Sequence, residues 1–270
     1  MKHPIVTLLT DFGDADGFVG AMRGVILGRA PAAQLVDLAH HVPRGDVDKA
    51  ARVLARAAPC FPPGTLHCVV VDPGVGSSRR AIAVQAGGFG FVAPDNGVLG
   101  DVLTELADPA AEAREITHPA LRIEPVSATF HGRDVFGPAA AALAAGFPFA
   151  DVGPRVEPVP HHRPPVVTGP DGRRRGRVIE VDTFGNLITD LHVEPDERVR
   201  VRVAGITFTG PAPAYAAVAP GKPVLVRGSL GTLEVAVRDG SAAARLGVIA
   251  GAPVDCVPCR PADDDGEWPA

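Results

Sequence analysis

The sequence predicts an α/β fold: an N-terminal, mostly parallel α/β sandwich domain followed by a small all-β, barrel-like domain. Up to about residue 145, short apolar runs alternate with helical patterns, which is typical of strands joined by helices in a covered parallel sheet. From residue 176 onward only short strand-like runs occur, separated by glycine, proline and aspartate, as in a small barrel or sandwich. We therefore expect an α/β domain at 1–160, a proline-rich linker at 161–175, a β domain at 176–260 and a disordered tail at 261–270.

Each element of the first domain has its own signal. Asp16 and Asp46 stand where N-caps are expected, and Phe18, Met22 and Ile26 share one face of the first helix. The expected strands are 5–9, 34–38, 66–71, 81–84 and 89–93, and the expected helices are 17–29, a segment after Asp46, 98–106 and 136–145. In the second domain the expected strands are 178–181, 198–203, 206–209, 224–226, 233–237 and 252–257.

Bulk composition narrows the classes of function. The 270 residues carry 26 basic and 31 acidic side chains, a net charge of −5, which argues against a general nucleic-acid or membrane surface. The chain shows neither a signal peptide nor an apolar run long enough to span a membrane, so we expect a soluble, cytoplasmic protein. The single C-x-x-C, Cys256 to Cys259, lacks a second pair at metal-ligand spacing, and we interpret it as structural or incidental.

The central stretch of the chain runs from 66 to 84. A buried strand pattern ends at Asp72, a loop with Gly74 and Gly76 follows, and Arg79 precedes the next strand pattern. The carboxyl end of a buried strand is where ligands bind in α/β sheets. The alternative is a hairpin with an ordinary surface Asp–Arg pair. The stretch does not match G-x-G-x-x-G, and the chain contains no G-x-S-x-G.

Five polar loops carry the motifs T-D-F-G, V-V-D-P-G-V-G-x-x-R, A-P-D-N-G, T-F-H-G-R-D and D-x-F-G-N. Together, and in this order between about residues 5 and 257, they resemble those of the S-adenosylmethionine hydrolase (SAM hydroxide adenosyltransferase) family, which is related to fluorinase and chlorinase. The resemblance implies hydrolysis of S-adenosyl-L-methionine to adenosine and L-methionine by attack of water at ribose C5′, without a cofactor or metal. It also implies a homotrimer whose sites lie between one subunit's N-terminal domain and a neighbour's C-terminal domain.

The resemblance assigns the activation of water to Asp72, Arg79 and His131. The sulfonium leaves as neutral methionine, so the chemistry needs no general acid. The difficulty is to orient a water molecule and give it hydroxide character, which suits an acceptor, a cation and a tunable base. His131 has the alternative role of a helix-capping residue.

The same resemblance assigns the substrate contacts. Asp11 matches the carboxylate that binds the ribose diol, with a helix cap as the alternative, and Asn96 of A-P-D-N-G is a further substrate-binding candidate. For the methionine amino group the candidates are Asp182 and Asn186, with Phe184 between them, and for the methionine carboxylate the candidate is Ser229. Tyr215 is the candidate for stacking on the adenine, with a packed barrel residue as its alternative.

Departures from the family separate its branches. Asp72, His131 and Gly132 stand where the halogenating relatives have tyrosine, tyrosine and serine, which favours the hydrolase over a halide-using adenosyltransferase. Leu230 and Thr232 depart from the usual residues of the carboxylate loop. A third hypothesis is a non-catalytic protein that binds adenosyl ligands, although a binder has no need of a water-activating trio.

Overall fold

The structure is a computed structural model that describes residues 3–160 and 164–259. The chain divides into two compact units, with the boundary between residues 162 and 163, and each unit is described by itself. Two strands, β7 (Val167–Thr168) and the first residues of β8 (Arg174–Val181), fall within the segment expected to be a linker. The tail expected to be disordered, 261–270, lies outside the described residues.

The N-terminal unit is built on a six-stranded sheet with the order β2-β1-β3-β5-β4-β6. The pairs β1/β2, β1/β3 and β3/β5 are parallel, whereas β4 is antiparallel to both β5 and β6, which confirms the expected mostly parallel sheet. The strands are β1 (Ile5–Thr10), β2 (Gln34–Ala39), β3 (Leu66–Val70), β4 (Ala81–Ala86), β5 (Phe89–Pro94) and β6 (Glu112–Glu115).

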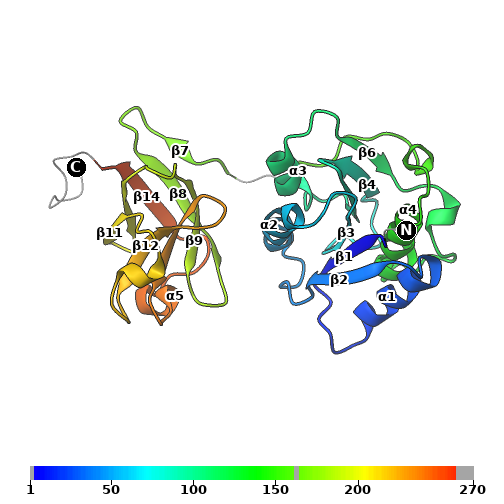
Figure 1. Cartoon of the computed structure of the whole chain (residues 1–270), viewed down its shortest axis with the longest axis horizontal. Helices are drawn as coiled ribbons and strands as arrows, with labels where there is room; N and C mark the ends of the chain where they lie inside the picture. Colours follow the sequence, from blue (N-terminus) through cyan, green and yellow to red (C-terminus); the bar gives the residue numbers. More distant parts are fainter. Residues whose placement is uncertain (1–2, 161–163, 260–270) are drawn as a thin grey trace. The chain divides into compact units, whose positions relative to one another are not determined.

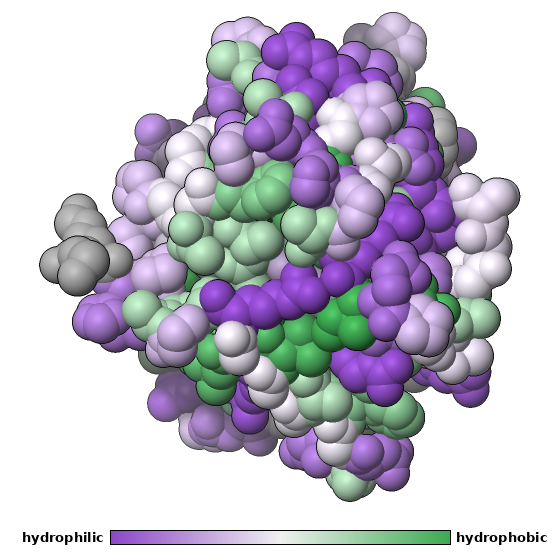
Figure 2. Space-filling view, turned by 90° about the vertical axis from the view of Figure 1, so that its right-hand side faces the viewer, coloured by the Kyte–Doolittle hydropathy of each residue, from purple (hydrophilic) through white to green (hydrophobic). Residues whose placement is uncertain are grey.

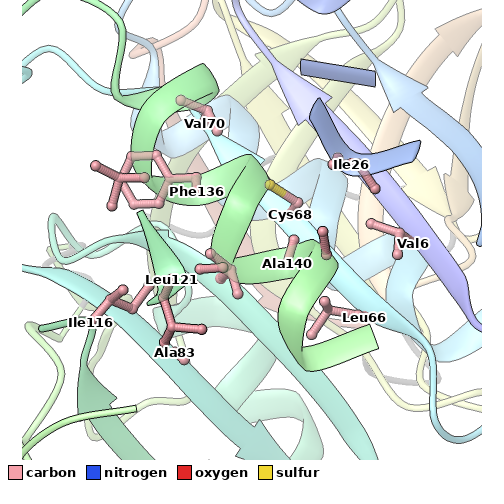
Figure 3. Packing of buried hydrophobic residues seen from close by; sticks show 14 of the residues in the cluster. Val6, Ile26, Leu66, Cys68, Val70, Ala83, Ile116, Leu121, Phe136 and Ala140 are labelled. Carbon is pink, nitrogen blue, oxygen red and sulfur yellow. The ribbon is translucent and has the colours of Figure 1, made fainter. Parts of the chain in front are cut away.

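Helices cover both faces of this sheet (Figure 1). α1 (Phe18–Arg29) and α4 (Gly137–Ala144) pack on one face, where Ile26 and Ala140 join strand residues such as Val6 and Cys68 in one buried cluster (Figure 3). α2 (Val47–Ala57) and α3 (Gly100–Leu106) pack on the other face through a second cluster that includes Leu54 and Val102. The buried apolar runs in the sequence therefore become the central strands of a three-layer sandwich.

The two predicted helix caps have different outcomes. Asp46 caps α2, because its carboxylate accepts a 2.8 Å hydrogen bond from the Lys49 amide. The prediction for Asp16 is wrong: Gly17, with φ of 76°, occupies the N-cap position of α1, and no side chain caps that helix. The first turn of α1 also leaves Phe18 45% exposed, although the periodicity placed it on the buried face with Met22.

The hairpin alternative for residues 66–84 is wrong as well. β3 pairs with β1 and β5, and β5 lies between β3 and β4, so the hairpin of this region is β4–β5. The loop from Asp72 to Arg79 therefore leaves the carboxyl end of a central parallel strand and crosses over β5 to reach β4.

The C-terminal unit is an antiparallel, nearly closed barrel-like sheet with the order β11-β10-β14-β8-β9-β13-β12, and β7 pairs with β8. The Ala212 amide after β11 donates a 2.8 Å hydrogen bond to the Leu225 carbonyl in β12, which brings the two end strands together. The remaining elements are β9 (Leu187–His192), β10 (Val199–Val203), β11 (Ile206–Gly210), β12 (Pro223–Arg227), β13 (Thr232–Val237), α5 (Ala242–Leu246) and β14 (Pro253–Pro258). Of these, β9 and α5 were not predicted.

Cys256 is buried in β14, Cys259 follows that strand, and both cysteines are free thiols. Within residues 3–160 and 164–259, no helix has both the length and the apolar character needed to cross a membrane.

Candidate active site

Several loops of the N-terminal unit converge at the carboxyl edge of its parallel strands. The Asn96 side-chain amide, after β5, donates a 3.0 Å hydrogen bond to the Val71 carbonyl, after β3. Gly45, in the loop after β2, packs against Pro73, since a Cβ on Gly45 would lie 3.5 Å from the Cβ of Pro73. The loops that follow β2, β3 and β5 are therefore tied together at the position where α/β sheets bind ligands.

Asp72, Arg79 and His131 form one connected group. The Arg79 Nε atom donates to both carboxylate oxygens of Asp72, at 2.9 and 3.0 Å, and Nη2 makes a further short bond to Oδ2. The same Nη2 lies 2.7 Å from the Nδ1 atom of His131. A guanidinium can only donate hydrogen bonds, so Nδ1 accepts and a neutral His131 ring carries its hydrogen on Nε2.

This group is largely shielded from solvent, with 4% of the Asp72 side chain and 11% of the Arg79 side chain exposed. The Arg79 guanidinium also lies over the Phe136 ring, 5.1 Å from its centroid. Burial lowers the pKa of His131 below its ordinary value of 6.5, Arg79 lowers it further, and Asp72 and Asp134 act in the opposite direction. His131 is therefore neutral at pH 7, with a cation held on one side of its ring.

Two glycines allow the loops of this group to meet. Gly76 has a φ of +77°, and a Cβ there would lie 2.5 Å from the Ala128 carbonyl oxygen. Gly132 begins a π-helical turn (Gly132–Phe136), and a Cβ on it would lie 2.9 Å from the Sδ atom of Met22. His131 stands at the N-cap position of this turn, but its side chain makes no cap hydrogen bond, so the capping alternative is wrong.

The carboxylate of Asp11 follows β1 and accepts a 2.8 Å hydrogen bond from the Gly45 amide. The helix-cap alternative for Asp11 is wrong, because α1 begins only at Phe18. One backbone donor leaves a carboxylate with further acceptor sites, as binding of a diol requires. The Asn96 side chain already makes two hydrogen bonds within the protein: its amide donates to the Val71 carbonyl, and its Oδ1 atom accepts a 3.2 Å hydrogen bond from the Val98 amide.

Three aromatic rings connect the Asp11 loop to the His131 loop. Phe12, Phe18 and Phe130 meet edge to face, with centroid distances between 5.1 and 6.0 Å. Phe12 follows Asp11 and Phe130 precedes His131, so this cluster holds the two polar side chains on neighbouring segments. These rings were not predicted to belong to the site, although the phenylalanine in each of the motifs D-F-G and T-F-H-G was a signal for them.

In the C-terminal unit, Asp182 and Asn186 form a closed turn between β8 and β9. The Asp182 Oδ1 atom accepts from the amides of Phe184 and Asn186 at 2.9 and 2.8 Å, and Oδ2 accepts from the Asn186 side chain at 2.9 Å. Phe184 is 77% exposed on the outside of this turn. Under the turn, the Ala243 amide of α5 donates to the Gly185 carbonyl at 2.9 Å, so the unpredicted helix α5 supports it.

Glu234 lies next to Tyr215 and the Ser229 loop, the other two predicted substrate-binding positions of the C-terminal unit. The Tyr215 hydroxyl donates a 2.9 Å hydrogen bond to Glu234 Oε2, and Gly228, next to Ser229, packs directly on the same carboxylate. Burial raises the pKa of Tyr215 to about 12, helped by Glu234 and by the nearby charge of Asp182. Tyr215 is 45% exposed, which contradicts the alternative of a packed barrel residue. Sequence reasoning missed Glu234, although a lone carboxylate in the apolar run T-L-E-V-A-V marked it.

A pocket of about 420 Å³ lies elsewhere in the N-terminal unit. Its walls include Ile5, Leu66 and Phe89, which begin β1, β3 and β5, so it lies at the opposite edge of the sheet from Asp72. Apolar residues also gather in patches on the molecular face drawn in Figure 2. None of the predicted site residues lines this pocket.

In the part of the chain that the structure describes, no three His, Cys, Asp or Glu side chains are grouped as metal ligands.

Fold and site together define a two-unit protein in which an α/β sandwich carries a polar site at its strand ends and a β unit carries a second polar group. The model of the SAM hydroxide adenosyltransferase N-terminal domain matches residues 6–153, and that of the C-terminal domain matches residues 176–255. The chain belongs to the SAM hydroxide adenosyltransferase family.

Individual relatives agree with this assignment. An (R)-S-adenosyl-L-methionine hydrolase of Salinispora tropica is 43% identical over 92% of this chain and 95% of its own length. A fluorinase of Nocardia brasiliensis is 28% identical over 74% of this chain and 75% of its own length. The crystal structure of an uncharacterized conserved protein from Thermotoga maritima superimposes with a TM-score of 0.85 and 38% identity, covering 94% of this chain and 100% of that one.

Proposed function

We propose that this protein hydrolyses S-adenosyl-L-methionine to adenosine and L-methionine. The observation that carries the proposal is the Asp72–Arg79–His131 group, in which one guanidinium binds a carboxylate and a neutral imidazole at the carboxyl edge of β3. The names of relatives more than 40% identical over nearly the whole chain give the reaction class.

In the proposed reaction, a water oxygen attacks C5′ in line with the C5′–S bond. The C5′–O bond forms, the C5′–S bond breaks, the sulfur leaves with the bonding pair as the neutral thioether of methionine, and the proton lost by the water passes to bulk solvent. The Asp72 carboxylate accepts a hydrogen bond from the attacking water. Arg79 favours hydroxide character on the water through its positive charge. His131, with Nδ1 held by Arg79, directs its Nε2–H to the water oxygen and orients it rather than taking the proton.

The remaining site residues are assigned to the substrate. Asp11 accepts from the ribose hydroxyls with the carboxylate sites that Gly45 leaves open. Asn96 supports the Asp72 strand end and borders the ribose.

In the C-terminal unit, Asp182 and Asn186 receive the methionine ammonium group, with Phe184 beside them. Ser229 receives the methionine carboxylate. Tyr215, held by Glu234, stacks on the adenine.

Product analysis tests the proposal and separates it from the alternatives. Purified protein is incubated with S-adenosylmethionine, with and without chloride or fluoride. Adenosine and methionine in every arm are the expected products. A 5′-halogenated adenosine would make the protein a halide-using adenosyltransferase, and tight binding without turnover would make it a binding protein.

We also propose that the active unit is a homotrimer with sites at subunit interfaces. Water activation and ribose binding are assigned to one unit, through Asp72 and Asp11, whereas methionine binding is assigned to the other, through Asp182. A head-to-tail contact between copies closes into a ring under cyclic symmetry and makes all its sites equivalent. An Asp72→Ala chain and an Asp182→Ala chain, each inactive alone, should regain activity after subunit exchange. Exchange without recovery, or an active monomer in sedimentation, would refute the shared site.

A further inference from the structure

His40, the residue after β2, lies in a polar chain that ends at the Asp11 loop. Its Nδ1 atom is 2.9 Å from the Thr10 hydroxyl, which in turn accepts a 3.3 Å hydrogen bond from the Phe12 amide. The His40 carbonyl accepts a 2.7 Å hydrogen bond from the Gly13 amide. His40 therefore binds the Asp11 loop on both sides of Asp11, through one side-chain and one backbone contact.

The other side of the imidazole faces charged groups. Nε2 lies 3.0 Å from Asp37 Oδ1, although it is not aligned as a hydrogen bond, and Asp37 pairs with Arg23 of α1. Burial lowers the pKa of His40, Arg23 and His41 lower it further, and Asp14 raises it. The Asp37 carboxylate also favours the charged ring, but Arg23 offsets it, so His40 is neutral at pH 7.

These contacts fix the directions of the hydrogen bonds. An unprotonated Nε2 would place its lone pair 3.0 Å from the Asp37 carboxylate and be repelled by it, so we assign the hydrogen of the neutral ring to Nε2 and the acceptor role to Nδ1. The Thr10 hydroxyl therefore donates to His40, and its oxygen is available to accept from the Phe12 amide. Thr10 is fully buried, so a hydroxyl without this acceptor would have no water to bond.

We propose that His40 is a positioning residue that holds the Asp11 carboxylate, through the Thr10 hydroxyl, in the geometry that binds the ribose. The inference rests on the proposed function, in which Asp11 receives the diol. His40 contacts the loop and not the reacting atoms, so its removal should weaken substrate binding and leave the chemical step largely intact.

A set of variants tests the proposal. His40→Leu removes the acceptor for Thr10, and we expect KM for S-adenosylmethionine to rise about tenfold, the size of one hydrogen bond, with kcat changed by less than about threefold. His40→Asn places an amide oxygen near the position of Nδ1 and should restore KM to within about twofold of wild type. Thr10→Val keeps the volume, removes the hydroxyl and should reproduce the His40→Leu result. His41→Asn is the matched control, because His41 is a neighbouring but exposed histidine.

A double-mutant cycle separates positioning from general destabilisation. If His40 acts through Asp11, His40→Leu should lower kcat/KM far less in the Asp11→Asn background than in wild type. Fully additive effects, a loss confined to kcat, or His40→Asn as impaired as His40→Leu would overturn the proposal.

Calorimetry with adenosine as the probe distinguishes the two possible failures. A wild-type protein that binds adenosine without hydrolysing S-adenosylmethionine would refute the proposed function. Weaker adenosine binding by His40→Leu than by wild type would then still support the positioning role, and equal binding would overturn it.

Discussion

Replacement of His131 tests the role that the geometry gives to its two ring nitrogens. Nδ1 accepts from Arg79, so Nε2–H is the donor available to the reacting water. His131→Ala removes both functions. His131→Asn keeps an oxygen near the position of Nδ1, so it can still accept from Arg79 but cannot reach the water. The two variants therefore separate the holding of Arg79 from the orientation of the water.

The expected magnitudes follow from the bonds that each variant loses. His131→Ala loses the hydrogen bond to the reacting water and the hydrogen bond from Arg79. With about 1.5–3 kcal/mol for each, we expect kcat to fall by about 10²–10⁴-fold. A hydrogen bond to a charged group contributes about 1.5–3 kcal/mol, or roughly 10- to 150-fold. His131→Asn should therefore retain kcat at least about tenfold above His131→Ala, with KM little changed in both variants because neither removes a substrate contact.

The assay is steady-state adenosine release as a function of pH. The pKa of His131 is lowered, so the neutral ring is the active form, and kcat of wild type should fall only below pH 6.5. This acidic limb should be absent in His131→Asn. A His131→Ala variant with near wild-type kcat would remove His131 from the mechanism, and equal rates for the two variants would show that the Arg79 contact contributes nothing.

Three further predictions concern the ribose, stability and loop contacts. Asp11→Asn should lower kcat/KM for S-adenosylmethionine by an amount worth about 1.5–3 kcal/mol and matter less for a 2′-deoxy analogue, since one hydroxyl partner is missing. Burial lowers the pKa of His67 from 6.5 to about 4, so its contribution to the free energy of unfolding, about 3 kcal/mol, should be lost from pH 6.5 down to about 4. In urea titrations, wild type should therefore lose about 3 kcal/mol more than His67→Phe over this range. Gly76→Ala should lower kcat because its Cβ would meet the Ala128 carbonyl, whereas Gly17→Ala, at the same φ with open space around it, should lower stability only.

Each of these predictions has a contradicting outcome. Equal damage to both substrates in Asp11→Asn would remove the diol assignment. Parallel pH dependence of unfolding in wild type and His67→Phe would place the titration on another residue. Equal kcat for the two glycine variants would show that the Gly76–Ala128 contact does not shape the site.

Much of the fold follows from local patterns, and the errors have local causes. The buried runs predicted at 5–9 and 66–71 and the Asp46 cap are specified by neighbouring residues. The structure confirms the cap and both strands, which it places at Ile5–Thr10 and Leu66–Val70. The entry to α1 was mispredicted because Gly17 turns the chain with its backbone and needs no capping side chain. α5 has five residues, too few for a helical period to be visible.

The site was predictable as a set of residues but not as a set of contacts. The motifs named Asp72, Arg79 and His131, and the resemblance supplied their roles, which stay predictions. The sequence could not show that one guanidinium joins the other two side chains, because His131 is 52 residues from Arg79. The packing of Phe12 on Phe130 and the bond between His40 and Thr10 likewise depend on which strands are neighbours.

Hydrolysis in ¹⁸O-labelled water tests the central claim most directly. If the Asp72–Arg79–His131 group delivers water to C5′, the products are methionine and adenosine, and mass spectrometry should find one labelled oxygen in adenosine, at the 5′-hydroxyl. Asp72→Ala should lose this product while the folded protein persists. Adenosine without label, label in any other product, or undiminished labelling by Asp72→Ala would contradict the account.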